Sequence, residues 1–397
     1  VEDTIYNWED YPVIQGEDDN SLPQPQAAAV VMDNKGHIKA IVGGRTAPTN
    51  KRELNRAMSP VMMASTIKPI SVYGPALEEG KSPATIYHNI PAKIEGWDAQ
   101  QDFPKNYGGG SYTGPTTMRE GLRRSLNIVA AQTLTYDVGF ETSKTYLEGL
   151  GIDPSHIQVN GSGLALGTSA ITPVELAGAY SAIANGGVYN EPISVLKVVD
   201  KDGNVLIDRT QNRIQRKIFS ERTAWMLIDM MKDAVKNGTG QRAQIPGMTV
   251  AGKTGTNSDY KGVAFAGFTP YYTGVVWIGH DEGKSLGNGV QGGRYAAPLW
   301  QAFMARIHEG LEDKDILDKG PEELGLVQKS ICKISGKLAG PNCPKGQIVV
   351  DWFNPDFLPR ETCTQHGTIQ ICSESGKIPG PYCPQASITT KSVYFLE

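Results

Sequence analysis

The distribution of cysteine divides this chain into two parts. All five cysteines fall between Cys332 and Cys383, so the first 331 residues of the 397-residue chain contain no thiol. Within the cysteine-containing part, the stretch 331–344 recurs as 371–384, with Ile-Cys, Ser-Gly-Lys, Gly-Pro and Cys-Pro at matching positions. This offset of 40 residues predicts a Cys/Gly/Pro-rich tandem-repeat appendage over 325–397, joined to a larger domain that folds without disulfides.

Two kinds of cross-link are compatible with such an appendage. A cluster of cysteines is typical of disulfides in an extracellular protein and of metal ligands in a cytosolic one. The chain has no CxxC pair, so the zinc interpretation is the weaker one, and we predict no metal. The first hypothesis for connectivity pairs Cys332 with Cys343 and Cys372 with Cys383. The counterpart of Cys363 would lie at position 403 (363 + 40), which would explain the odd cysteine count.

Histidines and methionines give no sign of a cofactor. The six histidines show no metal-ligand spacing: His37, His88, His156, His280, His308 and His366. Met226, Met230 and Met231 fit the core face of a helix better than a cofactor pocket. We therefore expect no cofactor.

Composition excludes several classes of protein. Hydrophobic residues make up 39%, charged residues 20%, and the formal net charge is -4, so no basic surplus favours nucleic acid as a partner. No run of eighteen apolar residues or signal-like segment is present. Residues 1–24 are predicted to be a linker or N-terminal extension, because 17–26 is acidic and rich in Pro and Gln.

The pattern of elements indicates a mixed α+β fold. Apolar runs bounded by turn residues predict strands over 27–32, 37–42, 248–251, 263–268 and 272–278. Helix-start signals at Thr117, Thr172 and Ser220, and an amphipathic run, predict helices from 117, 172–185, 220–235 and 297–311. Strands joined by short connections are expected to pair antiparallel.

Ser65-Thr66-Ile67-Lys68 places a hydroxyl and an amine on one face of a predicted helix. A serine becomes a nucleophile when a neighbouring base takes its proton, and a lysine serves as that base when burial or another cation lowers its pKa. The spacing alone is common by chance, so it gains weight only from other elements.

Two further polar groups follow. Ser125 and Asn127 lie just past a predicted helix end, where they either face a cleft or cap the helix. Lys253-Thr254-Gly255-Thr256 follows an apolar strand, where a cation and two hydroxyls would face a carboxylate; otherwise it is a polar strand-to-turn junction.

The segment 247–254 also satisfies the phosphate-binding pattern GxxxxGK[ST]. That loop must open a helix, but Gly255-Thr256-Asn257-Ser258-Asp259 resists helix formation. We expect no nucleotide site there.

In chain order, SxxK, SxN and KTGT resemble the active-site signature of penicillin-binding proteins and serine β-lactamases. Over about residues 24 to 310 the surroundings resemble the transpeptidase domain of bifunctional (class A) penicillin-binding proteins. The similar stretches are 25–28, 42–44, 55–57, 106–107, 165–167, 184–187, 238–240, 267–270 and 276–279.

This resemblance implies a five-stranded antiparallel sheet flanked by helices, plus a helical subdomain, within a transpeptidase domain over 25–320. It implies that Ser65 is the nucleophile, Lys68 its general base, and Ser125 the group that passes a proton to the leaving amine. Asn127 would hold the substrate amide. The terminal carboxylate would be bound by Lys253, Thr254, Gly255 and Thr256, with the backbone N–H groups of Ser65 and Thr256 as the oxyanion hole.

The implied activity is that of a peptidoglycan D,D-transpeptidase. The partners would be a D-Ala-D-Ala stem peptide, an amine acceptor from a neighbouring stem, and β-lactam antibiotics. Such a protein is expected at the extracytoplasmic face of the bacterial membrane, anchored there, with a glycosyltransferase domain upstream.

The chain departs from the family pattern at two places. Ala64 stands where a glycine usually precedes the serine, and Ala264-Phe265 replaces a Trp-Phe pair. A serine β-lactamase and a non-catalytic β-lactam sensor remain alternatives. The former needs an added carboxylate after SxN, and 158–163 offers none.

Overall fold

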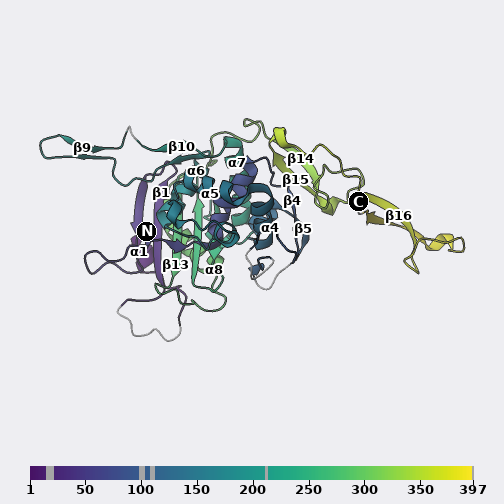
Figure 1. Ribbon diagram of the computed structural model, residues 1–397, viewed down its shortest axis with the longest axis horizontal. Helices are drawn as coiled ribbons and strands as arrows, with labels where there is room; N and C mark the ends of the chain where they lie inside the picture. The colour runs from purple at the N-terminus through teal and green to yellow at the C-terminus, as the bar shows by residue number, and fades with distance from the viewer. Residues whose placement is uncertain (15–21, 98–102, 108–111, 211–212, 396–397) are drawn as a thin grey trace.

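A computed structural model describes residues 1–14, 22–97, 103–107, 112–210 and 213–395. Its centre is a five-stranded antiparallel sheet in the order β11-β12-β13-β1-β2 (Figure 1). The strand bounds are β1 Gln26–Asp33, β2 Ile38–Val42, β11 Ala251–Thr256, β12 Gly262–Phe268 and β13 Tyr272–Gly279. The predicted α+β class and sheet are confirmed.

The sheet joins the two ends of the larger domain. Strand β1 pairs with β13, with Ala29 opposite Val276, although almost 250 residues separate them. Strand β1 alternates between the two faces: Ala28, Val30 and Met32 enter one core, and Ala27, Ala29 and Val31 enter the other. A strand buried on both faces must be apolar throughout, which explains the continuous run.

Helices cover both faces. Helix α6 (Pro173–Ala184) packs on β1, β12 and β13, and helix α8 (Gly292–Ile307) packs on the opposite face, where Trp300 meets Phe265. The full capping box predicted at Thr172 is present, with Glu175 bonded reciprocally. Helix α7 (Glu221–Lys236) begins at Ser220, as predicted, and contacts β11.

Further helices of the larger domain form the helical subdomain, beside which a short hairpin lies. Its α-helices are α2 (Gly74–Glu78), α3 (Met118–Arg123), α4 (Asn127–Gln132) and α5 (Phe140–Gly149). Single turns complete it: η2 (Ala64–Ile67), η3 (Pro69–Tyr73), η5 (Thr133–Val138), η6 (Pro154–His156) and η7 (Ser162–Leu166). The hairpin consists of β4 (Ile86–Asn89) and β5 (Gly114–Thr117), and β3 (Val61–Met62) pairs with β6 (Ala170–Ile171).

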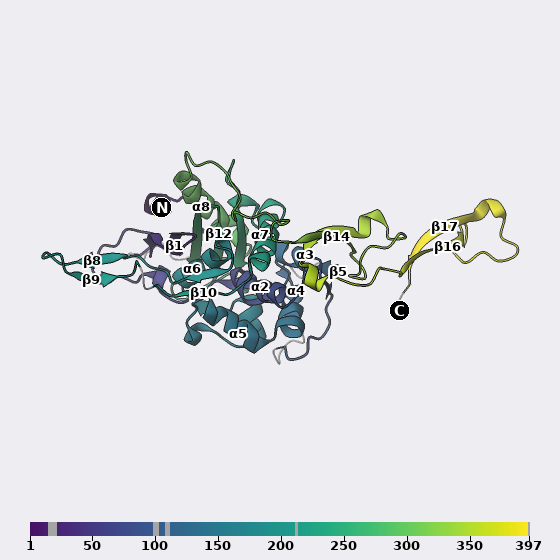
Figure 2. The same ribbon diagram turned by 90° about the horizontal axis from the view of Figure 1, so that it is seen from above.

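Slender hairpins extend from opposite ends of the molecule (Figures 1 and 2). At one end lie β8 (Lys197–Val199) with β9 (Val205–Asp208), beyond the pair β7 (Val188–Asn190) and β10 (Gln215–Lys217). At the other end β14 (Val327–Cys332) pairs with β15 (Ile348–Phe353), and β16 (His366–Cys372) pairs with β17 (Ile388–Tyr394). The repeat in the sequence is thus a repeat of hairpins.

Three expectations need correction. The strand expected over 248–251 is β11, which begins at Ala251, because Gly247 turns the chain and the Met248 N–H bonds back to the Ile245 carbonyl. The helix expected over 297–311 is α8, which begins at Gly292. Part of the expected linker 1–24 is packed instead: helix α1 (Glu2–Tyr6) lies on α8, with Ile5 and Tyr11 buried. The stretch 15–21 of that linker lies outside the described residues.

None of the helices in the described ranges is long and apolar enough to cross a membrane.

Candidate active site

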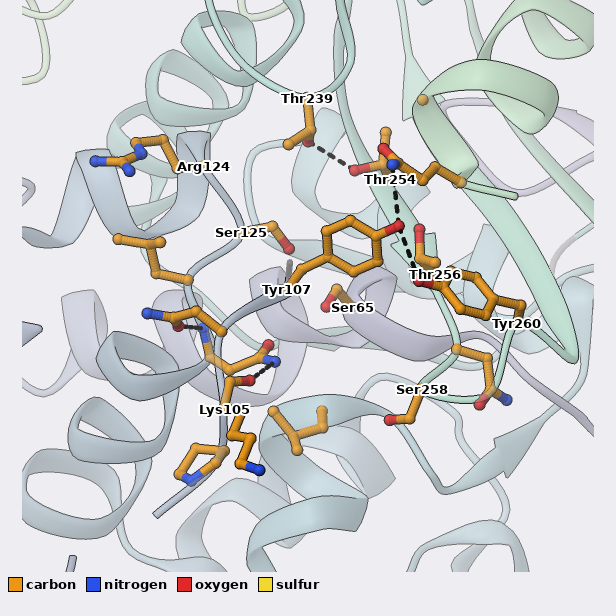
Figure 3. A pocket seen from close by; sticks show the side chains of 18 of the residues that line it. Ser65, Lys105, Tyr107, Arg124, Ser125, Thr239, Thr254, Thr256, Ser258 and Tyr260 are labelled. Carbon is orange, nitrogen blue, oxygen red and sulfur yellow. Dashed lines mark hydrogen bonds between the residues drawn. The ribbon is translucent and has the colours of Figure 1, made fainter. Parts of the chain in front are cut away.

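A cleft of about 990 Å³ lies between the helical subdomain and the free edge of β11. Five of the predicted site residues line it: Ser65, Ser125, Asn127, Thr254 and Thr256 (Figure 3). Four basic side chains also line it: Lys105, Arg124, Arg242 and Arg294. The described residues that line the cleft include no Asp or Glu. This cleft therefore favours an anionic ligand.

Ser65 is held at the cleft by a tight turn. It lies in η2, and the residue before it, Ala64, has a φ of 49°, in the left-handed region that L-residues other than glycine seldom adopt. The Ala64 N–H bonds to the Gly167 carbonyl at 3.2 Å. A Cβ on Gly167 would lie 2.0 Å from the Ala64 carbonyl oxygen, so only glycine fits there. The glycine missing at 64 thus leaves a strained residue beside Ser65.

Lys68 is fully buried beneath the cleft. Its Nζ donates to the Ser125 carbonyl at 3.1 Å and to Asn127 Oδ1 at 2.7 Å. Burial, and next the charge of Lys253, hold the pKa of Lys68 well below its usual value. A lysine with a lowered pKa loses its proton more readily, and a deprotonated amine can accept a proton from a serine, so this environment favours the predicted role of Lys68 as a base. Its two hydrogen-bond acceptors are groups other than the Ser65 hydroxyl.

Lys253 lies on β11 and is also fully buried. Its Nζ donates to Ser125 Oγ at 2.8 Å and to the Thr254 carbonyl at 2.8 Å. Burial lowers the pKa of Lys253 to about 7. Ser125 itself follows α3 with a φ of 58°, which turns its hydroxyl toward β11 and its carbonyl toward Lys68. The structure therefore brings the three predicted motifs together around Ser125.

Asn127 is fixed at both ends of its amide. Oδ1 accepts from Lys68, and Nδ2 donates to the Lys105 carbonyl at 2.8 Å. The backbone N–H of Asn127 donates to Asn106 Oδ1 at 2.8 Å. Asn106 in turn donates to Asn89 Oδ1 at 2.7 Å. This chain of amides fixes one wall of the cleft.

The free edge of β11 forms the opposite wall. The Asn257 N–H bonds to the Gly262 carbonyl at 3.0 Å, and antiparallel ladder bonds alternate, so the Thr256 N–H points away from β12 toward the free edge. Thr254 Oγ1 lies 2.6 Å from Thr239 Oγ1, and Thr256 Oγ1 accepts from the Gly292 N–H at 3.0 Å. A Cβ on Gly255 would lie 2.4 Å from the Met63 carbonyl oxygen, so this glycine lets β11 approach η2.

Several lining residues carried no chemical role in the sequence-based prediction. Tyr107 and Tyr260 meet edge to face, with ring centroids 6.2 Å apart and a hydroxyl contact of 3.3 Å, and the two rings cross the cleft mouth in Figure 3. Arg242 and Arg294 come from η8 (Gln241–Ala243) and α8. Neither arginine belongs to a recognised motif, and no spacing rule connects the motif at 253–256 to position 294.

The phosphate-loop pattern at 247–254 runs into strand β11. The next elements along the chain are the strands β12 and β13, so this segment does not open a helix as a phosphate-binding loop must.

A second group of reactive side chains lies outside the cleft. All five cysteines are free, so the structure does not contain the expected pairs Cys332–Cys343 and Cys372–Cys383. Cys332, Cys343, Cys363 and His366 instead converge, with their ligand atoms within 4.8 Å of one another. No metal-ligand spacing was expected for the histidines, but the fold brings His366 beside three thiols, two of which, Cys332 and Cys343, belong to the preceding hairpin.

Comparison with known proteins agrees with this architecture. Residues 27–305 match the penicillin binding protein transpeptidase domain, and residues 323–368 match the penicillin-binding protein 1A C-terminal domain. Penicillin-binding protein 1A of Clostridium tetani is 31% identical over 388 residues, covering 92% of this chain and 48% of that protein. That of Clostridium acetobutylicum is 36% identical over 314 residues, covering 75% of this chain and 38% of that protein. The chain thus spans about half the length of the curated relatives it matches, or less.

Solved structures show the same fold. Penicillin-binding protein 1A from Haemophilus influenzae superposes with a TM-score of 0.72 at 25% identity, covering 86% of this chain and 55% of that one. PonA1 from Mycobacterium tuberculosis gives 0.64 at 22% identity, covering 74% and 80%, and has also been solved with penicillin V. On the extent of the sequence matches, this chain belongs to the penicillin-binding protein transpeptidase family and resembles its 1A members.

Proposed function

We propose that the chain is a peptidoglycan D,D-transpeptidase that uses Ser65 as its nucleophile. One observation carries the proposal: Ser65 opens into a basic cleft beneath which two fully buried lysines, both with a lowered pKa, meet at Ser125. Burying two lysine side chains without a carboxylate partner is costly, and such an arrangement is typical of a catalytic site.

In the first step Ser65 Oγ attacks the carbonyl carbon of a D-Ala-D-Ala bond, and its proton passes to the neutral Nζ of Lys68. The oxygen of the tetrahedral intermediate becomes negative and is bound by the backbone N–H groups of Ser65 and Thr256. The orientation of the Thr256 N–H toward the free edge of β11 supports this assignment. The two hydrogen bonds that Lys68 donates use both N–H groups of a neutral amine and leave its lone pair to accept the Ser65 proton.

The amide C–N bond then breaks, and the departing D-alanine amine needs a proton. Lys253 donates to Ser125 Oγ, so a protonated Lys253 can replace the proton that Ser125 gives away. The carboxylate of the leaving residue is bound by Thr254 and Thr256, with the charge of Lys253 behind them and Gly255 allowing the close approach.

The amine of a neighbouring stem peptide then attacks the carbonyl carbon of the ester on Ser65 and forms the cross-link. Its proton passes through Ser125 to Lys253, and Lys68 returns its proton to Ser65 Oγ as the ester C–O bond breaks. A β-lactam follows the first step only, since its ring-opened acyl group stays on the serine. We propose that the whole protein acts at the extracytoplasmic face of the bacterial membrane, with an anchor and a glycosyltransferase domain in the rest of its length.

The acid-free cleft favours transfer over hydrolysis. A serine β-lactamase of the kind considered above activates its deacylating water with a carboxylate, and the described lining contains none. The same feature leaves a slow acyl-enzyme as the expected state after penicillin.

The test incubates the chain and a Ser65→Ala variant with a fluorescent penicillin, then follows intact mass and release of hydrolysed drug. We expect a persistent adduct on the wild type only. A second assay supplies a D-Ala-D-Ala peptide and an amine acceptor, and we expect D-alanine release together with the cross-linked product. Rapid drug turnover would favour the β-lactamase, and labelling without peptide turnover would favour the sensor.

A further inference from the structure

The C-terminal module contains a compact cluster of metal-binding side chains. Cys332, Cys343, Cys363 and His366 are 0%, 8%, 5% and 5% exposed, respectively. Their ligand atoms all lie within 4.8 Å of one another, and Cys332 Sγ is 3.2 Å from His366 Nε2. Three thiols and an imidazole thus share one buried site, and none of these four residues lines the cleft.

Backbone hydrogen bonds hold the three cysteines close together. Cys332 ends β14, where its N–H bonds to the Lys337 carbonyl at 2.9 Å, and the Cys343 N–H closes a turn on the Gly340 carbonyl at 3.1 Å. Cys363 is bonded through its N–H to the Leu338 carbonyl at 2.8 Å. A Cβ on Gly340 would lie 2.2 Å from the Cys363 carbonyl oxygen, so glycine allows the two segments to pack.

We propose that Cys332, Cys343, Cys363 and His366 bind one zinc ion in a tetrahedral structural site. With Zn–S near 2.3 Å and Zn–N near 2.0 Å, tetrahedral geometry places the ligand atoms about 3.5–3.8 Å apart. The observed cluster meets this requirement with small adjustments. A Cys332–Cys343 disulfide would use only two of these groups and leave a thiol and an imidazole buried beside it.

The surroundings support a structural ion. The Gly340 N–H donates to Cys343 Sγ at 3.3 Å, the kind of bond that stabilises a thiolate ligand. The ring of His366 packs on Tyr394 with centroids 5.2 Å apart, which orients the imidazole. Three apolar side chains pack on the thiols: Ile334, Ala339 and Ile348. Four protein ligands fill the tetrahedron and leave no position for a substrate.

Zinc binding displaces the three thiol protons, so a divalent cation with three thiolates and a neutral imidazole carries one net negative charge. The ligands come from two parts of the module. Cys332 and Cys343 belong to the first repeat, whereas Cys363 and His366 lead into β16 of the second hairpin. The ion therefore fastens the second hairpin to the first.

The second repeat provides an internal control. Cys372 and Cys383 occupy equivalent positions, and the Cys372 N–H bonds to the Lys377 carbonyl as Cys332 does to Lys337. Over the ranges that the structure describes, Cys372 and Cys383 are not joined by further metal-binding side chains as Cys332 and Cys343 are. We expect one zinc ion per 397-residue chain.

The test purifies the whole chain under reducing conditions without chelator and measures zinc content and free thiols. We expect one equivalent of zinc in the wild type and in Cys383→Ser, and loss of bound zinc in Cys363→Ser and His366→Ala. Cobalt exchanged into the site should give the visible spectrum of a tetrahedral thiolate complex. A circular dichroism melt on each variant shows whether the larger domain is still folded.

Two results would overturn the proposal. One is wild-type chain without zinc after incubation with zinc chloride, with a Cys332–Cys343 disulfide found by peptide mass mapping in its place. The other is equal zinc loss in Cys383→Ser and Cys363→Ser, which would indicate non-specific thiol binding.

Discussion

Lys253 donates a hydrogen bond from Nζ to Ser125 Oγ over 2.8 Å, across the cleft from its own strand β11 to the end of α3. Lys68 approaches the same serine from the other side and bonds its carbonyl at 3.1 Å. Ser125 therefore connects two buried lysines, each with a lowered pKa. This arrangement ties proton transfer at Ser65 to proton transfer at the leaving group.

Replacing Ser125 tests that connection. Ser125→Ala removes the hydroxyl that links Lys253 to the cleft, and we expect the rate of penicillin acylation to fall about 10²–10³-fold, the usual contribution of a positioned proton-transfer group. Stopped-flow measurement with a fluorescent penicillin gives the rate. Ser258→Ala is the matched control, because Ser258 lines the same cleft but has no hydrogen bond to either lysine, and its rate should be close to wild type. Equal rates for all three proteins would remove Ser125 from the mechanism.

The buried lysines make stability depend on pH. Burial lowers the pKa of Lys253 to about 7 in the folded chain, against an ordinary lysine pKa of 10.5. Between these values the unfolded chain holds a proton that the folded chain has released, so unfolding takes up protons and stability rises with pH. We expect the free energy of unfolding to increase from pH 7 to pH 9 by about 1–2 kcal/mol from this group.

Chemical denaturation at several pH values measures this slope. Lys253→Met keeps the volume and removes the charge, so the slope should become shallower and the variant should be more stable than wild type near pH 6. Lys261→Met is the control for removing an exposed positive charge. A slope unchanged in Lys253→Met would show that Lys253 keeps an ordinary pKa in the folded chain.

The turn before Ser65 depends on close packing at Gly167. Gly167→Ala would place a Cβ 2.0 Å from the Ala64 carbonyl oxygen at a φ of 77°, so backbone must move and shift Ser65. Gly203 also has a positive φ, so Gly203→Ala carries a similar conformational penalty of about 1 kcal/mol, but its added Cβ would meet no other atom within 4 Å. We expect Gly167→Ala to lose most penicillin labelling and several degrees of melting temperature, while Gly203→Ala keeps full labelling. Normal labelling of Gly167→Ala would show that the turn tolerates displacement.

Helix starts could be predicted from the sequence, because a helix cap depends on residues that are close together in the chain. The capping box at Thr172 and the cap at Ser220 depend on neighbours within three residues, and both helices begin there. The meeting of the three motifs in one site was predicted from their resemblance to a known signature, and the structure brings them together around Ser125. The sequence thus predicted the five-stranded sheet and five of the residues that line the cleft.

What the sequence did not reveal depends on distant contacts. Strand β11 includes Lys253 and Gly255, although lysine and glycine have a low propensity for buried strands. Gly255 is needed there because it packs closely against the Met63 carbonyl, which is distant in the sequence. Helix α8 begins at Gly292 rather than 297, because a glycine there fits against the Gly255 carbonyl. The cluster around His366 requires a parallel bridge between Leu338 and Thr362, which no short spacing predicts.

Several charged contacts dock the C-terminal module on the larger domain, and the one that involves Asp351 is the most buried. Arg119 of α3 donates to both carboxylate oxygens of Asp351 on β15, at 2.7 and 2.5 Å, and also to Asp229 at 2.6 Å. The bidentate pair raises the pKa of the Arg119 guanidinium although burial opposes it. The Asp351 side chain is 6% exposed, so its charge is screened little by water.

Asp351→Asn keeps the shape and removes the charge. We expect docking of the module to weaken by about 1–3 kcal/mol, because Arg119 loses a buried partner but keeps Asp229. Limited proteolysis under native conditions should then cleave near residue 324 at least several times faster, while penicillin labelling of Ser65 stays at the wild-type level. Asp356→Asn is the matched control, because its bridge to Arg222 is 3.2 Å long and its side chain is 69% exposed, so it should change neither rate. If both variants were cleaved at the wild-type rate, apolar contacts such as that of Trp225 with Trp352, 5.5 Å apart, would be sufficient to hold the module in place.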